Sequence, residues 1–175
     1  MATQALGQEL SNREFFIQRW KEEYPAFLRV FKALPADRLD YQPHPRSRSA
    51  GELVALLGSA LQGCIGLCKN QKSMYDGMHW EEPTGFGPLQ EMVAAYERDQ
   101  ETFAEQLRTL DDHAWHHQAW LIRGKQEILL KGTVGGLLWI AFFDAVHHRG
   151  QLSTYIRPMG GKVPSIYGPS ADTGA

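Results

Sequence analysis

Apolar side chains recur at three- and four-residue steps in four stretches of the chain, which is the spacing of one face of an amphipathic helix. The stretches run from Ser11 to Leu34, from Ser49 to Leu67, from Pro88 to Leu110 and from Thr133 to Tyr155. The first two begin with capping boxes, in which a serine is followed three residues later by a glutamate. The pattern therefore predicts four long helices.

The chain between the third and fourth predicted helices breaks the helical period. Short apolar runs at 120–122 and 128–130 flank Gly124, which indicates two strands joined by a glycine turn. Because amphipathic helices bury their apolar faces by packing on one another, we expect an all-α four-helix bundle with a short β-hairpin before the last helix. The long connection from Gly77 to Pro88 leaves room for a crossover, which allows up-down-down-up order.

We expect the bundle to form a single domain over residues 1–175, because this length suits one core and the chain shows no internal repeat. Residues 1–10 are expected to form a loose N-terminal arm. Residues 160–175 are rich in Pro, Gly and Ser and are expected to form an irregular C-terminal tail.

Charge and apolar run lengths limit the classes of partner. The net charge is −2, with no excess of Lys or Arg to neutralise phosphates, so we expect no nucleic-acid partner. No apolar run approaches the length needed to cross a bilayer, and the N-terminus lacks the basic start and apolar core of a secretory signal. These features predict a cytoplasmic protein with no membrane partner. In a reducing compartment, Cys64 and Cys68 act as small apolar residues.

The sharpest chemical feature is a carboxylate and an imidazole one helical turn apart, Asp144 and His148. Side chains four residues apart on a helix lie one above the other, so this pair can share one divalent ion at about 2.0–2.2 Å. Leu137, Ala141 and Tyr155 lie on the same face, which predicts that the pair points inward. The alternative is an Asp144–His148 hydrogen bond that satisfies two core polar groups without a metal.

Two stretches resemble the end of proteins of the DinB/YfiT-like family: HHRGQL at 147–152 and GKVPSIYGPSAD at 161–172. Residues 39–54 resemble the segment that leads into that family's second helix, and the resemblance extends from about Phe15 to Asp172. It implies a four-helix bundle, often a homodimer, with a site of three histidines that holds zinc or nickel. One histidine lies on the second helix and two on the fourth. Relatives include thiol-dependent S-transferases and isomerases.

This chain departs from that pattern at two of the three histidine positions. The second-helix histidine is replaced by Leu56 and the first histidine of the last helix by Asp144, so only His148 matches. Leucine cannot bind a metal, and catalytic zinc sites normally use three protein ligands. His147 and Tyr155 are expected to line the site and not to complete it.

Two functions stay open on this basis. In the first, the chain is a DinB-like protein with a degenerate metal site, either non-catalytic or binding a small-molecule ligand, and holds a metal weakly or not at all. In the second, Asp144 and His148 hold zinc or nickel in a metal-dependent hydrolase or a small-thiol S-transferase. The missing ligand favours the first function, and the sequence names no substrate.

Overall fold

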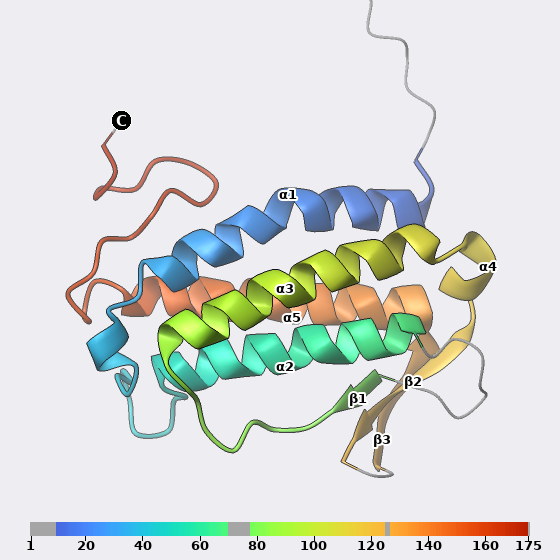
Figure 1. Ribbon diagram of the computed structural model, residues 1–175, viewed down its shortest axis with the longest axis horizontal. Coiled ribbons are helices and arrows are strands. Elements are labelled where there is room, and N and C mark those ends of the chain that lie inside the picture. The colour runs from blue at the N-terminus through green and yellow to red at the C-terminus, as the bar shows by residue number, and fades with distance from the viewer. Residues whose placement is uncertain (1–9, 70–77, 125–126, 175) are drawn as a thin grey trace, which may run out of the picture.

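The computed structural model describes residues 10–69, 78–124 and 127–174, which are mostly helical and carry a small sheet. In chain order the elements are α1 (Asn12–Lys32), the short 3-10 helix η1 (Ala36–Arg38), α2 (Ala50–Lys69), β1 (Met78–Trp80), α3 (Leu89–Thr109), α4 (Asp112–Trp115), β2 (Gln118–Arg123), β3 (Glu127–Thr133) and α5 (Val134–Tyr155) (Figure 1). Residues 1–9, where most of the expected N-terminal arm falls, lie outside the described part.

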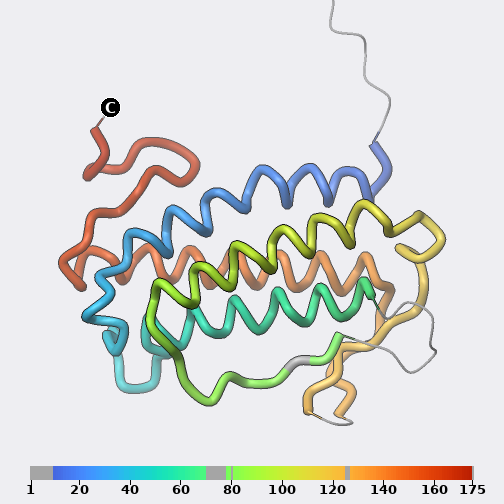
Figure 2. The backbone as a smooth tube through the Cα atoms, viewed as in Figure 1, coloured from blue at the N-terminus to red at the C-terminus, as the bar shows by residue number. Residues whose placement is uncertain are grey.

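The four long helices lie side by side, as Figures 1 and 2 show. Helix α2 packs against α3 and α5, and α1 packs against the same two helices from the other side. Helices α1 and α5 run in one direction, and α2 and α3 run in the opposite direction. Residues 81–88 return along the helices to the start of α3, which lets α2 and α3 run parallel.

The described residues form five α-helices instead of the four predicted from periodicity. The additional helix, α4, is a single turn that begins where the Asp111 side chain accepts a hydrogen bond of 2.8 Å from the Ala114 amide. A single turn is too short to display an apolar period, so the hydrophobic pattern could not reveal it.

Side-chain caps are in place at three helix starts, and the first two are the capping boxes predicted from the sequence. Ser11 and Glu14 form a reciprocal capping box at α1. The Glu52 amide donates to the Ser49 hydroxyl at 3.2 Å, and the Ser49 amide donates to the Glu52 carboxylate at 2.6 Å. At α5 the Thr133 hydroxyl accepts a hydrogen bond from the Gly136 amide. Each cap satisfies first-turn amides that have no partner within the helix.

A three-stranded sheet replaces the predicted two-stranded hairpin, so the all-α expectation was incomplete. Strands β2 and β3 pair antiparallel, as predicted, and Gly124 follows β2 with a φ of +57°. Strand β1 adds to the sheet by pairing parallel with β2, with Met78 opposite Leu121. The sequence predicted only a connection there, because a three-residue strand is too short to show alternation and its partner is distant in sequence.

Helix α2 corrects the expectation that no apolar run could cross a bilayer. By length and composition it could do so, and it is the one such helix among the described residues. However, 61% of the most apolar 18-residue stretch of this helix is buried inside the protein. Packing against α3 and α5 accounts for this apolar character.

A buried arginine ties α5 to α1 and to the C-terminal tail. Arg149 forms an ion pair with Glu23 of α1, donates a hydrogen bond of 2.5 Å to the Tyr167 hydroxyl, and lies over the Phe27 ring. A buried guanidinium needs such partners to offset the loss of its hydration. The described tail residues, 160–174, contain no helix or strand and are held in part by this contact.

Close packing of α4 on α5 leads to a stability prediction. A Cβ added to Gly135 would lie 2.1 Å from the buried Trp115 ring, whereas one added to Gly150 of the same helix would meet nothing within 4 Å. We expect Gly135→Ala to lower the free energy of unfolding by about 1–3 kcal/mol. The matched control, Gly150→Ala, should raise it by about 0.5–1 kcal/mol. Urea denaturation followed by circular dichroism measures both, and an unchanged Gly135→Ala midpoint would contradict the packing.

Candidate functional site

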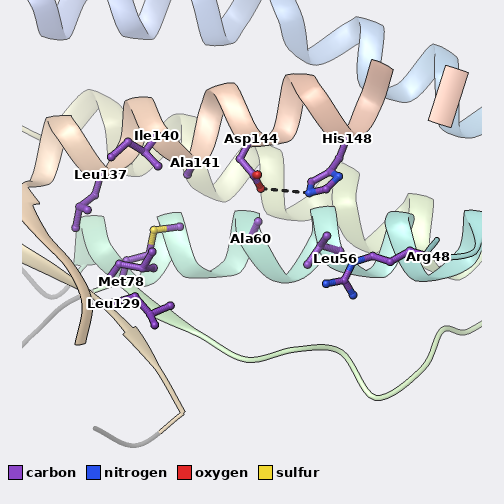
Figure 3. A pocket seen from close by; sticks show the side chains of 11 residues that line it. Arg48, Leu56, Ala60, Met78, Leu129, Leu137, Ile140, Ala141, Asp144 and His148 are labelled. Atoms are coloured by element: carbon purple, nitrogen blue, oxygen red, sulfur yellow. Dashed lines mark ion pairs between the residues drawn. The ribbon is translucent and has the colours of Figure 1, made fainter. Parts of the chain in front are cut away.

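A cavity of about 240 Å³ lies between α2, α5 and the sheet. Its polar lining residues are Arg48, Asp144 and His148, and its apolar lining residues are Leu56, Ala60, Met78, Leu121, Leu129, Leu137, Ile140 and Ala141. Figure 3 shows the polar groups toward one end and Met78, Leu129 and Leu137 toward the other. The cavity therefore has a polar end and an apolar body.

Asp144 and His148 face each other at the polar end. His148 Nε2 and Asp144 Oδ2 are 3.6 Å apart, and 19% of the His148 side chain is exposed against 58% of Asp144. The prediction that both point inward therefore needs correction, because Asp144 lies at the mouth of the cavity. A turn of α5 that also exposes Ile140 and Phe143 carries it there.

The distance between His148 Nε2 and Asp144 Oδ2 indicates what can lie between them. At 3.6 Å, Nε2 and Oδ2 are too far apart for the direct hydrogen bond considered from the sequence. Two ligands of one tetrahedral ion, each about 2.1 Å from it, lie roughly 3.4 Å apart. The pair is therefore spaced to receive a cation between them.

A hydrogen-bond chain behind His148 orients its ring. Tyr155 donates to the Arg48 carbonyl at 3.3 Å, Gln151 donates to the Tyr155 hydroxyl at 2.9 Å, and His148 Nδ1 lies 3.1 Å from Gln151 Oε1. A backbone carbonyl can only accept, so each donor in the chain is determined from that end. Nδ1 must then carry the proton that Gln151 Oε1 accepts.

Because Nδ1 of His148 donates to Gln151, the second ring nitrogen, Nε2, is left as an acceptor. In a neutral ring with its proton on Nδ1, Nε2 presents a lone pair toward the Asp144 carboxylate. Two acceptors that face each other repel unless a positive group lies between them. The same arrangement, with the outer nitrogen hydrogen-bonded and the inner one free, is typical of histidines that bind metals.

The cysteines of α2 do not contribute a nucleophile. Cys64 and Cys68 are buried in the core. Burial raises the pKa of Cys68 to about 12 and raises the pKa of Cys64 as well. Both thiols therefore stay protonated, and a protonated thiol is a poor nucleophile and a poor metal ligand.

Comparison with known proteins identifies the relatives of this fold. The model of the DinB family matches residues 1–175. The chain belongs to the DinB family. The resemblance inferred from the sequence is thereby confirmed, and no curated protein matches the chain.

Two solved DinB-like structures are similar to this one. A DinB-like protein from Bacillus cereus ATCC 10987 is 17% identical, with a TM-score of 0.68 over 87% of this chain and 95% of that one. A DinB-like protein from Bacillus subtilis, YjoA, is 17% identical, with a TM-score of 0.63 over 92% of this chain and 99% of that one. At this identity the likeness shows the fold alone, which is a DinB-like helical fold.

The residues of this DinB protein fit a metal only in part. Leu56, which stands where the resemblance implies a histidine, is buried and lines the cavity beside His148 (Figure 3). Among the residues that the structure describes, no group of three or more His, Cys, Asp or Glu side chains could hold a metal ion. Two metal-ligating side chains, Asp144 and His148, are thus suitably spaced, and the third ligand is missing.

The other candidate residues take different places. His147 is exposed, packs its ring against the His148 ring at 5.1 Å between centroids, and does not line the cavity. Tyr155 is buried and acts on the site through the hydrogen-bond chain and not as a lining group.

Sequence reasoning missed several contributors to the site. Gln151 could have been found, because it lies three residues after His148 and four before Tyr155, on one helical face. Arg48 gave no signal of a functional role in the sequence, yet it lines the cavity and forms an ion pair with Glu82. Met78 and Leu129 had no local signal, since long-range strand pairing brings them to the cavity.

The hydrogen-bond chain leads to a prediction about the His148 ring. In the native protein, nitrogen NMR shifts should place the proton of the neutral ring on Nδ1. Gln151→Leu removes its acceptor, so the proton should shift toward Nε2, where it can point at Asp144, and stability should fall by about 1 kcal/mol. Gln90→Leu, at an exposed position of α3, is the matched control. If the neutral His148 ring of the native protein carries its proton on Nε2, the order of donors in the hydrogen-bond chain is wrong.

Proposed function

We propose that this DinB protein binds a small, largely apolar molecule in the cavity between α2, α5 and the sheet, and does not catalyse a reaction on it. The helices of the bundle would follow up-down-down-up order. The metal site would be degenerate, because Leu56 stands in place of the third ligand. One observation carries the proposal: the cavity keeps a volume of about 240 Å³ although Leu56 occupies the place of a metal ligand.

The lining of the cavity supports a ligand over a metal. Eight of its eleven lining residues are apolar, and they come from α2, α5 and all three strands. Each Å² of apolar ligand surface buried there contributes about 25 cal/mol to the free energy of binding. Ligand pockets combine such a lining with a few oriented polar groups, and at this volume the ligand is smaller than a typical drug.

A second candidate is a metal-dependent hydrolase or a small-thiol S-transferase. The 3.6 Å spacing of Asp144 and His148 and the free Nε2 lone pair favour it. Asp144 and His148 would hold zinc or nickel, while Gln151 and Tyr155 orient the imidazole. A divalent ion bound there would lower the pKa of a bound water or thiol. Two protein ligands hold such an ion less tightly than the three of catalytic zinc sites.

Filling the cavity tests the proposed function. Ala60 lines it from α2, so Ala60→Leu should occupy the space of the ligand and weaken heptanol binding by about tenfold or more. Ala171→Leu, at an exposed position of the C-terminal tail, is the control and should leave binding unchanged. Calorimetry gives the affinity, and the methyl resonance of Met78 reports on the location. Heptanol that binds Ala60→Leu as well as the native protein would refute this cavity as the ligand site.

Metal affinity separates the two candidates. On the proposed function, protein purified without a chelating tag holds much less than one zinc or nickel ion per chain. Leu56→His should then supply the third donor and tighten zinc binding by about tenfold or more, measured by competition with a coloured chelator. Leu56→Ala, which adds no donor, is the control. Near-stoichiometric metal in the native protein that is lost in Asp144→Ala would instead establish the metal-dependent candidate.

We also propose that two copies of the chain associate through the exposed apolar part of α5. Phe143 is 64% exposed and Ile140 48% exposed, and Phe15 of α1 lies beside them on Trp139. Apolar side chains grouped in this way are typical of interfaces. Sedimentation should give twice the mass of one chain, and Phe143→Ser should give a single chain that stays folded. A native monomer would contradict the proposal.

A further inference from the structure

The polar end of the cavity presents two acceptors and no donor between them. His148 Nε2 and Asp144 Oδ2 are 3.6 Å apart, and the described part of the chain donates no hydrogen bond to Asp144. The hydrogen-bond chain from the Arg48 carbonyl keeps Nδ1 as the donor, so in the neutral ring Nε2 is an acceptor for whatever enters. The occupant of this end must therefore be positive and rich in hydrogen-bond donors.

We propose that the ligand is a primary amine with an apolar body, whose ammonium group binds between Asp144 and His148. This inference rests on the proposed function and names the class of its ligand. An ammonium nitrogen about 2.8–2.9 Å from each acceptor spans their separation with only slightly bent hydrogen bonds. Its third N–H points to water, since Asp144 stands at the open mouth of the cavity.

The other charge at this end does not oppose an amine. Arg48 lines the cavity, but its guanidinium is paired with the Glu82 carboxylate, which offsets its charge. An anionic ligand would have to break that pair and would face the Asp144 carboxylate. The charges of the polar end therefore select a cation over a carboxylate.

The shape of the cavity places the body of the amine. From the acceptor pair the cavity extends past Ala60 and Ala141 to Met78 and Leu129 (Figure 3). Leu56, beside His148, offers an aliphatic contact to the first carbons of a chain, where a metal would need a third donor. A short alkyl chain or a single ring suits a volume of about 240 Å³.

A matched series of seven-carbon ligands tests this inference. Heptylamine, heptanol, heptanoate and heptyltrimethylammonium share one apolar body and differ only in the end group. They are titrated by calorimetry into the full chain after metal removal with a chelator, and the Met78 methyl resonance locates each. We expect heptylamine to bind about tenfold more tightly than heptanol, because its hydrogen bonds are charge-assisted. Heptyltrimethylammonium, which has no N–H donor, should bind no better than heptanol.

A pair of variants assigns the effect to the acceptors. Asp144→Asn should remove the preference for heptylamine over heptanol, whereas Asp37→Asn, in η1, should leave that preference unchanged. Asp144 is exposed, so its replacement leaves the core untouched.

The outcomes separate this inference from the proposed function. Equal binding of heptylamine and heptanol, tighter binding of heptanoate, or binding of heptyltrimethylammonium as tight as that of heptylamine would overturn the amine and leave the cavity as a ligand site. If no member of the series perturbs Met78, both the inference and the proposed function fail. A preference for heptylamine that survives in Asp144→Asn would also overturn the assignment.

Discussion

The packing of α5 between α1 and α2 is the constraint on which the rest of the structure depends. Consecutive side chains on a helix diverge by about 100°, so His148 and Arg149 must point in different directions. Arg149 is buried and contacts Glu23 and Tyr167 on the α1 side. Separating a buried guanidinium from its partners leaves an uncompensated charge, so this contact favours the observed rotation of α5. In that rotation His148 lines the cavity between α2 and α5.

The hydrogen-bond chain converts this placement into a defined chemical state. It begins at a backbone carbonyl, passes through a phenol and an amide, and ends at an imidazole whose remaining nitrogen accepts. Each link is a modest neutral hydrogen bond, but the order of donors is imposed by the carbonyl alone. In this state the site suits the positive occupant proposed above. This holds for an ammonium group and for a metal ion, since both require a free lone pair on His148.

On the proposed function, Leu56 decides between these two occupants. A third nitrogen donor at its position would complete a metal-binding set with Asp144 and His148, whereas an isobutyl group extends the apolar lining to the edge of the polar pair. On the proposed function, this one side chain favours contact with an apolar ligand over coordination of a metal. The sheet adds Met78, Leu121 and Leu129 to the same lining, which lengthens the apolar body of the cavity away from the acceptors.

The sequence by itself determined the four long helices, the hairpin, the family, and the placement of Asp144 and His148 one turn apart. The helix starts and the Asp144–His148 pair depend on local spacing, because caps and helical neighbours lie within four residues of each other. Only the tertiary structure decided that β1 joins β2, that Asp144 lies at the mouth, and that Arg48, Met78 and Leu129 border the same cavity. Those contacts join residues that are distant along the chain, and their geometry depends on how α5 packs, which periodicity does not encode. The tertiary structure also decides which nitrogen of His148 carries the lone pair, since this depends on a carbonyl contributed by the segment before α2.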